Sequence, residues 1–186
     1  MRKISVLFKE SIKEFKSVRC ITFTAMLGAI SVVLGSLRID VTPFLRISFS
    51  FLPNRFVFYL FGPAVGGIYG AAMDILTFII KPSGAFHPGI TFNAFITGVI
   101  YGLVLYKKPA TIKRIFIADI IQMIIVNLLL QTYWLTGLTG LSFFALFPPR
   151  ALKALIMLPI ETLLFYSAVK AVEATGIKKI LSGRGM

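Results

Sequence analysis

Long apolar runs separated by short polar connections constrain this chain more than any other feature. Of its 186 residues, 57% are hydrophobic, whereas soluble domains are about 45–50% apolar. One membrane-spanning helix needs about 20 predominantly apolar residues, so the length allows roughly six spans and no separate soluble domain. We therefore predict an all-α integral membrane protein in which residues 1–186 form a single membrane domain.

Six apolar segments are candidate spans. They cover residues 18–37, 47–61, 63–81, 90–106, 112–136 and 148–174. The second and third meet at Gly62-Pro63, where a proline suits the first turn of a new helix. The second is the least regular, because it is short and contains Pro53 and Arg55.

Residues 1–17 place apolar side chains at helical spacing, with lysines and glutamates on the other face. This pattern predicts an amphipathic helix lying on the membrane surface. The alternative is a helix that docks on a partner protein.

The net charge of +13 is distributed unevenly between the connections. Basic residues cluster in the N-terminal segment, in the 107–114 connection and in the C-terminal segment, while the 38–46, 82–89 and 137–147 connections contain only Arg38 and Arg46. With six spans, the three basic regions fall on one side of the membrane, which the positive-inside rule makes cytoplasmic. We therefore expect both termini in the cytoplasm, and a charge that needs no nucleic-acid partner.

Polar and aromatic residues recur at one level of the predicted spans. A charge at the bilayer centre costs about 2.5–3.5 kcal/mol on insertion scales, so each one needs a partner, water or a ligand. The residues at the outward-facing ends of four spans, and in the loop between the third and fourth, are Asp74, His87, Asn93, Thr97, Gln131, Trp134, Arg150 and Lys153. Their shared level predicts a ligand cavity beneath the outer loops.

The residue types indicate the ligand's chemistry. Arg150 and Lys153 are three apart and share a helix face, and two cations in a low dielectric suit carboxylates. They could instead snorkel to headgroups or pair with Asp74. Trp134 could stack on a planar ring or belong to an interfacial aromatic belt. His87 is either a ligand contact or a solvated loop residue.

Two further charges are predicted to pair in mid-membrane. Arg55 and Glu161 lie at similar depth, so we expect an ion pair, and reversing both charges together should then retain folding. Asp119 is predicted near the inner surface, where it would meet the basic 107–114 connection.

Several function classes lack their sequence signatures. There is no GxxxxGK[ST] phosphate loop, and no paired nucleophile and base. The single histidine, His87, and the single cysteine, Cys20, are far apart and give no metal-ligand cluster. We therefore expect no metal, no cofactor and no enzymatic activity, and hence either a passive protein or one powered by partners.

Three segments together resemble a known family. GPAVGGIYGAAMDIL (62–76), KPSGAFHPGITFNAFITGVIYG (81–102) and FPPRALKALIMLPIE (147–161) are similar to the folate-family S component of energy-coupling factor (ECF) transporters. The resemblance implies a six-helix, vitamin-binding subunit in a bacterial plasma membrane. It also implies a transmembrane coupling subunit and two cytoplasmic ATPases as partners, with the ATPases supplying the energy.

The resemblance also implies roles for individual residues. Ala25 and Ala29 match the family's small-residue motif that docks on the coupling subunit, and the loops at 38–48 and 82–90 correspond to its lids. For a folate ligand, Asp74 or Asn93 would bind pterin N–H groups and Trp134 would stack. Arg150 and Lys153 would meet a carboxylate or the ring oxygen. The alternatives are an S component for another vitamin, or a passive channel or assembly subunit.

Overall fold

The computed structural model describes residues 2–36, 38–42, 45–82, 86–140 and 142–174. Its helices are α1 (Arg2–Glu14), α2 (Val18–Ser36), α3 (Phe51–Ile80), α4 (Pro88–Leu105), α5 (Ile112–Gln122), α6 (Gln131–Thr139) and α7 (Phe143–Ala174). A π-helical segment, η1 (Met123–Leu130), joins α5 to α6. By length and composition α2, α3, α4, the continuous α5–η1–α6 segment and α7 can each cross a membrane, which is the pattern of a multi-pass membrane protein.

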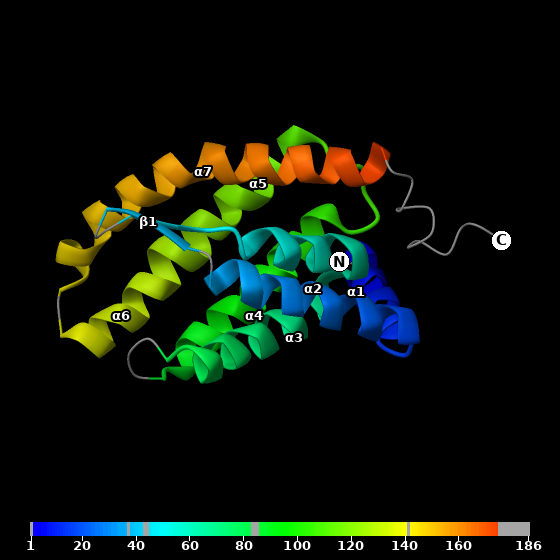
Figure 1. The fold of residues 1–186 in the computed structure, drawn as a ribbon, viewed down its shortest axis with the longest axis horizontal. Helices are drawn as coiled ribbons and strands as arrows, with labels where there is room; N and C mark the ends of the chain where they lie inside the picture. Colours follow the sequence, from blue (N-terminus) through cyan, green and yellow to red (C-terminus); the bar gives the residue numbers. More distant parts are fainter. Residues whose placement is uncertain (1, 37, 43–44, 83–85, 141, 175–186) are drawn as a thin grey trace.

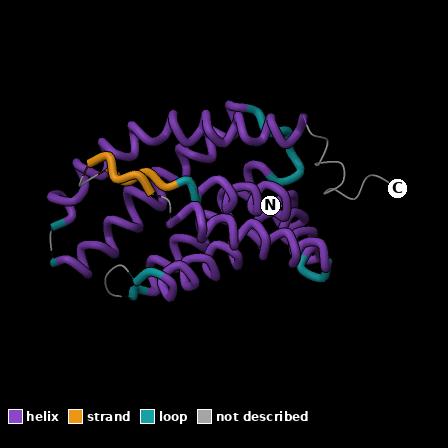
Figure 2. The backbone as a smooth tube through the Cα atoms, viewed as in Figure 1, coloured by secondary structure: helices purple, strands orange, loops and turns teal. Residues whose placement is uncertain are grey.

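The described residues confirm a helical fold, to which they add one short pair of strands. Strands β1 (Arg38–Thr42) and β2 (Leu45–Ser48) pair antiparallel between α2 and α3 (Figure 2). The span predicted to start at residue 47 therefore starts too early, since residues up to Ser48 are strand and α3 begins at Phe51. Apolar and polar residues alternate in both strands, which is the period of a strand rather than of a helix.

Helix α3 is not one straight helix. Gly62 interrupts it with φ 86° and ψ −170°, a conformation essentially restricted to glycine. Residues on either side of Gly62 meet, since the Tyr69 hydroxyl donates to the Asn54 side-chain oxygen at 3.0 Å. In a continuous helix these two residues would lie about 22 Å apart along the axis. The two halves of α3 therefore fold back on each other as a helical hairpin (Figure 1).

Ser11 of α1 satisfies backbone groups that the break at Gly62 exposes. Its buried hydroxyl donates to the Phe61 carbonyl oxygen at 2.7 Å and accepts from the backbone N–H groups of Ala64 and Val65, both at 3.1 Å. A serine usually does this for its own helix as an N-cap, but here it comes from another helix. α1 is thereby anchored to the helical hairpin, while its apolar side chains Ile4, Val6 and Ile12 stay exposed.

Glycines bring the second half of α3 into backbone contact with α4. A Cβ added to Gly98 would lie 2.1 Å from the Gly66 carbonyl oxygen, and one added to Gly70 would lie 2.5 Å from the Ala94 carbonyl oxygen. Small residues allow helix backbones to approach this closely within a membrane. The packing fixes the register of α3 and α4, and with it the relative positions of their polar side chains.

The two ends of the molecule carry different connections (Figure 1). Helix α1, the connection between α4 and α5, and the last turns of α7 lie at one end. The other end, which we call the hairpin end after strands β1 and β2, contains these strands, the end of α3 with the start of α4, and the end of α6 with the start of α7.

Replacing Gly62 with alanine should destabilise the protein by about 1–3 kcal/mol. The positive φ disfavours any Cβ, and the added atom would lie 2.9 Å from the Tyr106 ring and 3.1 Å from the Ser11 Cβ. Thermal unfolding of the purified protein measures the change. Gly137→Ala is the matched control, since a Cβ there meets nothing within 4 Å. Equal melting temperatures for the two variants would contradict the prediction.

Candidate functional site

A cavity of about 600 Å³ lies between α2, α3, α4, the α5–η1–α6 segment and α7. Sites for small molecules typically measure about 300–1,000 Å³ and combine an apolar lining with a few convergent polar groups. Here the apolar lining includes Val32, Phe51, Phe58 and Met73, and every surrounding element also contributes polar side chains. The cavity is therefore large enough, and mixed enough in character, to hold a small organic molecule.

The wall formed by α3 and α4 is polar toward the hairpin end. Asp74 lines the cavity and accepts a hydrogen bond from the Thr91 hydroxyl at 2.7 Å. Thr77 extends this surface along α3, and Thr97 lines the cavity from α4. Asp74 is thus held at the cavity by a neighbouring helix, and no cation of the described residues forms an ion pair with it.

The π-helical segment shapes the opposite wall. In η1 the backbone hydrogen bonds run from i to i+5. Such segments are rare in proteins, and those that occur are often found at functional sites. Gln122, Asn127 and Gln131, spaced across η1 and its two ends, all line the cavity. An uninterrupted α-helix would distribute residues five and nine apart differently around its axis, so η1 is what places these amides on the cavity wall.

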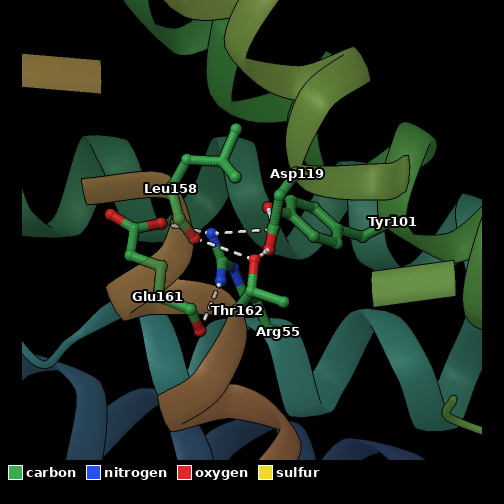
Figure 3. Close-up of polar contacts among 6 residues, drawn as sticks. All are labelled: Arg55, Tyr101, Asp119, Leu158, Glu161 and Thr162. Atoms are coloured by element: carbon green, nitrogen blue, oxygen red, sulfur yellow. Dashed lines mark hydrogen bonds and ion pairs between the residues drawn. The ribbon is translucent and has the colours of Figure 1, made fainter. Parts of the chain in front are cut away.

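A charged network forms the floor of the cavity (Figure 3). The Arg55 Nη2 atom contacts a carboxylate oxygen of Glu161 and lies 3.2 Å from the Asp119 Oδ1 atom, and Nη1 donates to the Glu161 carbonyl oxygen at 3.4 Å. Asp119 also accepts hydrogen bonds from the hydroxyls of Tyr101 and Thr162. We call Arg55, Tyr101, Asp119, Glu161 and Thr162 the floor network.

The floor network lies deeper than Asp74. The turn of α3 at Gly62 lies at the end of the molecule opposite the hairpin end (Figure 1). Asp74 is twelve residues from Gly62 and Arg55 is seven, so Arg55 lies about 8 Å further from the hairpin end than Asp74 does. Its guanidinium carbon is 4.7 Å from the Phe51 ring centroid and 4.8 Å from that of Tyr101, so cation–π attraction adds to the ion pairs. Arg55, Tyr101 and Glu161 line the cavity, whereas Asp119 lies behind them.

Trp134 is the centre of a separate contact cluster beside the cavity. A Cβ added to Gly89 would lie 2.4 Å from its indole ring, so the ring rests directly on the first turn of α4. The indole N–H donates to the Asn93 side-chain oxygen at 3.3 Å. His87 caps α4, because its Nδ1 atom accepts from the Gly89 N–H at 3.1 Å, and its ring centroid is 5.2 Å from that of Trp134.

The structure brings the predicted site residues together in three groups. Asp74, Thr97 and Gln131 line the cavity. The second group, His87, Asn93 and Trp134, forms the cluster beside it. Arg150 and Lys153 lie on α7 and are not among the described residues that line the cavity, and the Arg150 Nη2 atom is 3.5 Å from the carbonyl oxygen of the lining residue Asn127.

The expected Arg55–Glu161 ion pair is present, but two other expectations need correction. Asp119 does not meet the basic 107–114 connection, because it is buried and pairs with Arg55. The alternative of an ion pair between Asp74 and Arg150 is not found among the described residues, where Asp74 accepts from the Thr91 hydroxyl.

Arg55, Tyr101 and Glu161 also line the cavity, which the sequence pattern did not predict. Arg55 lies seven residues before Gly62, and Asp119 lies seven residues after Ile112, where α5 begins. Both are thus about 10 Å from the same end of the molecule. This equality of depth was available in the sequence and would have indicated their contact.

Comparison with known proteins gives concordant matches. A family model described as "ECF transporter, substrate-specific component" matches residues 19–169. A folate transporter FolT of Clostridium novyi (strain NT) is 38% identical over 158 residues, covering 85% of this chain and 92% of the relative. A folate transporter FolT of Leuconostoc mesenteroides subsp. mesenteroides is 34% identical over 148 residues, covering 76% of this chain and 80% of the relative.

The fold is also similar to a solved structure. A crystal structure of FolT bound with folic acid matches with a TM-score of 0.72 and 33% sequence identity. The match covers 81% of this chain and 92% of the solved chain. The similarity therefore covers most of both chains.

Exchanging the charges of Arg55 and Glu161 should not preserve folding, although a simple ion pair would allow it. The carboxylate introduced at position 55 would then face Asp119, and breaking a buried pair costs about 3–5 kcal/mol. The yield and thermal stability of the doubly reversed protein measure this. As a control, exchanging Glu10 and Lys107, an exposed pair at 3.0 Å, should change stability by about 1 kcal/mol or less. Wild-type stability of the Arg55–Glu161 exchange would show that Asp119 does not belong to the network.

Proposed function

The chain belongs to the family of substrate-specific components of ECF transporters, and on that premise we propose that it is the membrane-embedded subunit that binds folate for uptake. The observation that carries the proposal is the cavity of about 600 Å³ in a fold similar to FolT bound with folic acid. Two further relatives that span most of the chain are named folate transporters. Folate combines a planar pterin with a dicarboxylate tail, so it needs hydrogen-bond acceptors and donors, a flat apolar contact and cations.

The polar groups around the cavity can meet these needs. Asp74 lines the cavity and has no cation paired with it among the described residues, so it can accept N–H donors. Trp134 and Asn93 stand immediately beside the cavity wall and, in this proposal, present an aromatic face and an amide to the ligand. The Nδ2 atom of Asn93 is buried without a hydrogen-bond partner among the described residues, and such a donor is normally satisfied.

The cations lie at the start of α7, toward the hairpin end. Arg150 and Lys153 are one turn apart, and Arg150 contacts the backbone of Asn127, which lines the cavity. In the proposal they attract the ligand's carboxylates, with Thr97 and Gln131 completing the polar lining and His87 holding the first turn of α4.

We place six crossings in the membrane, counting the two halves of α3 separately, with both termini in the cytoplasm. The helical hairpin at Gly62 supports the count, since its halves run in opposite directions. The arrangement of the ends supports the orientation, because α1, the basic 107–114 connection and the last turns of α7 lie together. The bilayer would be a bacterial plasma membrane.

The energy for transport would come from partners. The sequence has no phosphate-binding loop of its own, so the proposal requires a transmembrane coupling subunit and two cytoplasmic ATPases. A subunit for another vitamin would keep this architecture and differ only in ligand. A passive channel would instead conduct without ATPases.

Purified protein should bind labelled folate saturably, and neutralising either Arg150 or Lys153 with methionine should weaken binding about tenfold or more, as expected for a charge-assisted contact. Equilibrium binding in detergent or nanodiscs is the measurement. Lys170→Met is the matched control, because Lys170 is exposed on the same helix and pairs with Glu173. Absence of saturable folate binding by the wild type would overturn the proposed ligand.

Large residues at Ala25 and Ala29 should abolish transport by the assembled complex while leaving folate binding unchanged. Both alanines are exposed on α2, whereas Gly28 is buried and a Cβ added to it would lie 3.2 Å from the Met73 sulfur. Gly28→Leu is therefore the contrasting control, which should lower stability and binding together. Parallel assays of uptake and of binding distinguish the outcomes. Loss of binding in the alanine variants would make those positions part of the internal packing.

A further inference from the structure

The floor network contains one cation and two carboxylates, and its hydrogen bonds are divided unequally between them. Asp119 accepts from Arg55, Tyr101 and Thr162 and is buried behind the cavity. Glu161 has one carboxylate oxygen against Arg55, while no described residue donates a hydrogen bond to the other. In Figure 3 that second oxygen points away from the rest of the network.

Glu161 therefore carries the part of the network that is open to a ligand. Its side chain is 27% exposed, against 4% for Asp119, and it lines the cavity. A carboxylate oxygen that faces a cavity in a low dielectric is stabilised by a hydrogen-bond donor. The cation that contacts Glu161, Arg55, is shared with Asp119.

We propose that Glu161, positioned by Arg55, is the hydrogen-bond acceptor that selects an aminated heterocycle at the floor of the cavity. The pterin of folate presents an exocyclic amino group beside a ring N–H, which are the donors that a half-occupied carboxylate lacks. This inference rests on the proposed function and deepens it, because it gives the pterin N–H donors to Glu161 at the floor and leaves Asp74, nearer the hairpin end, to the rest of the ligand.

The same geometry orients the ligand. Arg150 and Lys153 precede Glu161 on α7 by eleven and eight residues, so they lie about 16 and 12 Å nearer the hairpin end. The surplus negative charge is thus at the floor and the cations are toward the hairpin end. A molecule with N–H donors at one end and carboxylates at the other fits with its heterocycle at the floor and its acidic tail toward α7's first turns.

Equilibrium binding of two ligands tests the proposal. The ligands are folic acid and its analogue without the 2-amino group, and the proteins are the full-length wild type, Glu161→Gln and, as matched control on the same helix, Glu173→Gln. For the wild type and the control, the analogue should bind about 10–100-fold more weakly than folic acid, as a charge-assisted hydrogen bond implies. For Glu161→Gln, folic acid should weaken by a similar factor and the difference between the ligands should shrink to about threefold or less.

We expect the Glu161→Gln variant to fold, because Asp119 still neutralises Arg55. If that variant nevertheless fails to fold, Glu161→Asp keeps the charge and withdraws the oxygen from the cavity. It should then also lose most of the discrimination between the ligands.

The outcomes separate the two proposals. If the Glu161 variant weakens the binding of both ligands equally, or of neither, the proposed role of Glu161 is overturned. The proposed folate-binding function is not affected by that result. A wild type that binds neither ligand overturns the proposed function itself.

Discussion

A single guanidinium joins the parts of the protein that enclose the cavity. Arg55 comes from the first half of α3, and its two carboxylate partners come from α5 and α7. Tyr101 brings in α4 through Asp119. Within a membrane there is little hydrophobic force to drive helices together, so interhelical hydrogen bonds and close packing must hold them. Four helical segments thus depend on one charge whose removal would leave two carboxylates without their cation.

The helical hairpin in α3 makes this arrangement possible. Because Gly62 reverses the chain, Arg55 enters the bundle on a short helical segment, about 16 Å long from Phe51 to Phe61. The reversal exposes backbone groups inside a membrane, where each unsatisfied group is costly. Ser11 satisfies three of them. Helix α1 and the floor network are therefore both attached to the helical hairpin that turns at Gly62.

Apolar patterning and glycine-proline punctuation predicted the helices and the position of the reversal, because both are local properties of the sequence. The β1–β2 pairing was missed, since its alternating pattern is short and lies beside a long apolar run. The site was predicted only in part. Asp74, Thr97 and Gln131 line the cavity, but Arg150 and Lys153 do not, because depth along a helix does not specify which way a side chain faces.

The π-helical segment η1 explains why Gln122 and Asn127 were not predicted to line the cavity. A sequence pattern is interpreted with a period of 3.6 residues, and η1 departs from that period over Met123–Leu130. The side chains of α6 are therefore rotated about the helix axis relative to the positions that an uninterrupted α-helix would predict. The partners of Asp119 were not predicted, because Asp119 is close in the sequence to the basic connection. Its actual partner, Arg55, lies at the same depth on another helix.

Holding the helices together does not account for both carboxylates at the floor of the cavity. Buried ion pairs can often be replaced by well-packed apolar residues without loss of stability, and the surrounding core is already apolar and aromatic. The asymmetry within the network points the same way, because Asp119 alone, with Arg55, Tyr101 and Thr162, would be a saturated structural unit. Glu161 adds a second carboxylate that this unit does not need, and it is the one that lines the cavity. The structural and recognition functions of the network therefore rest on different carboxylates, with Arg55 shared between them.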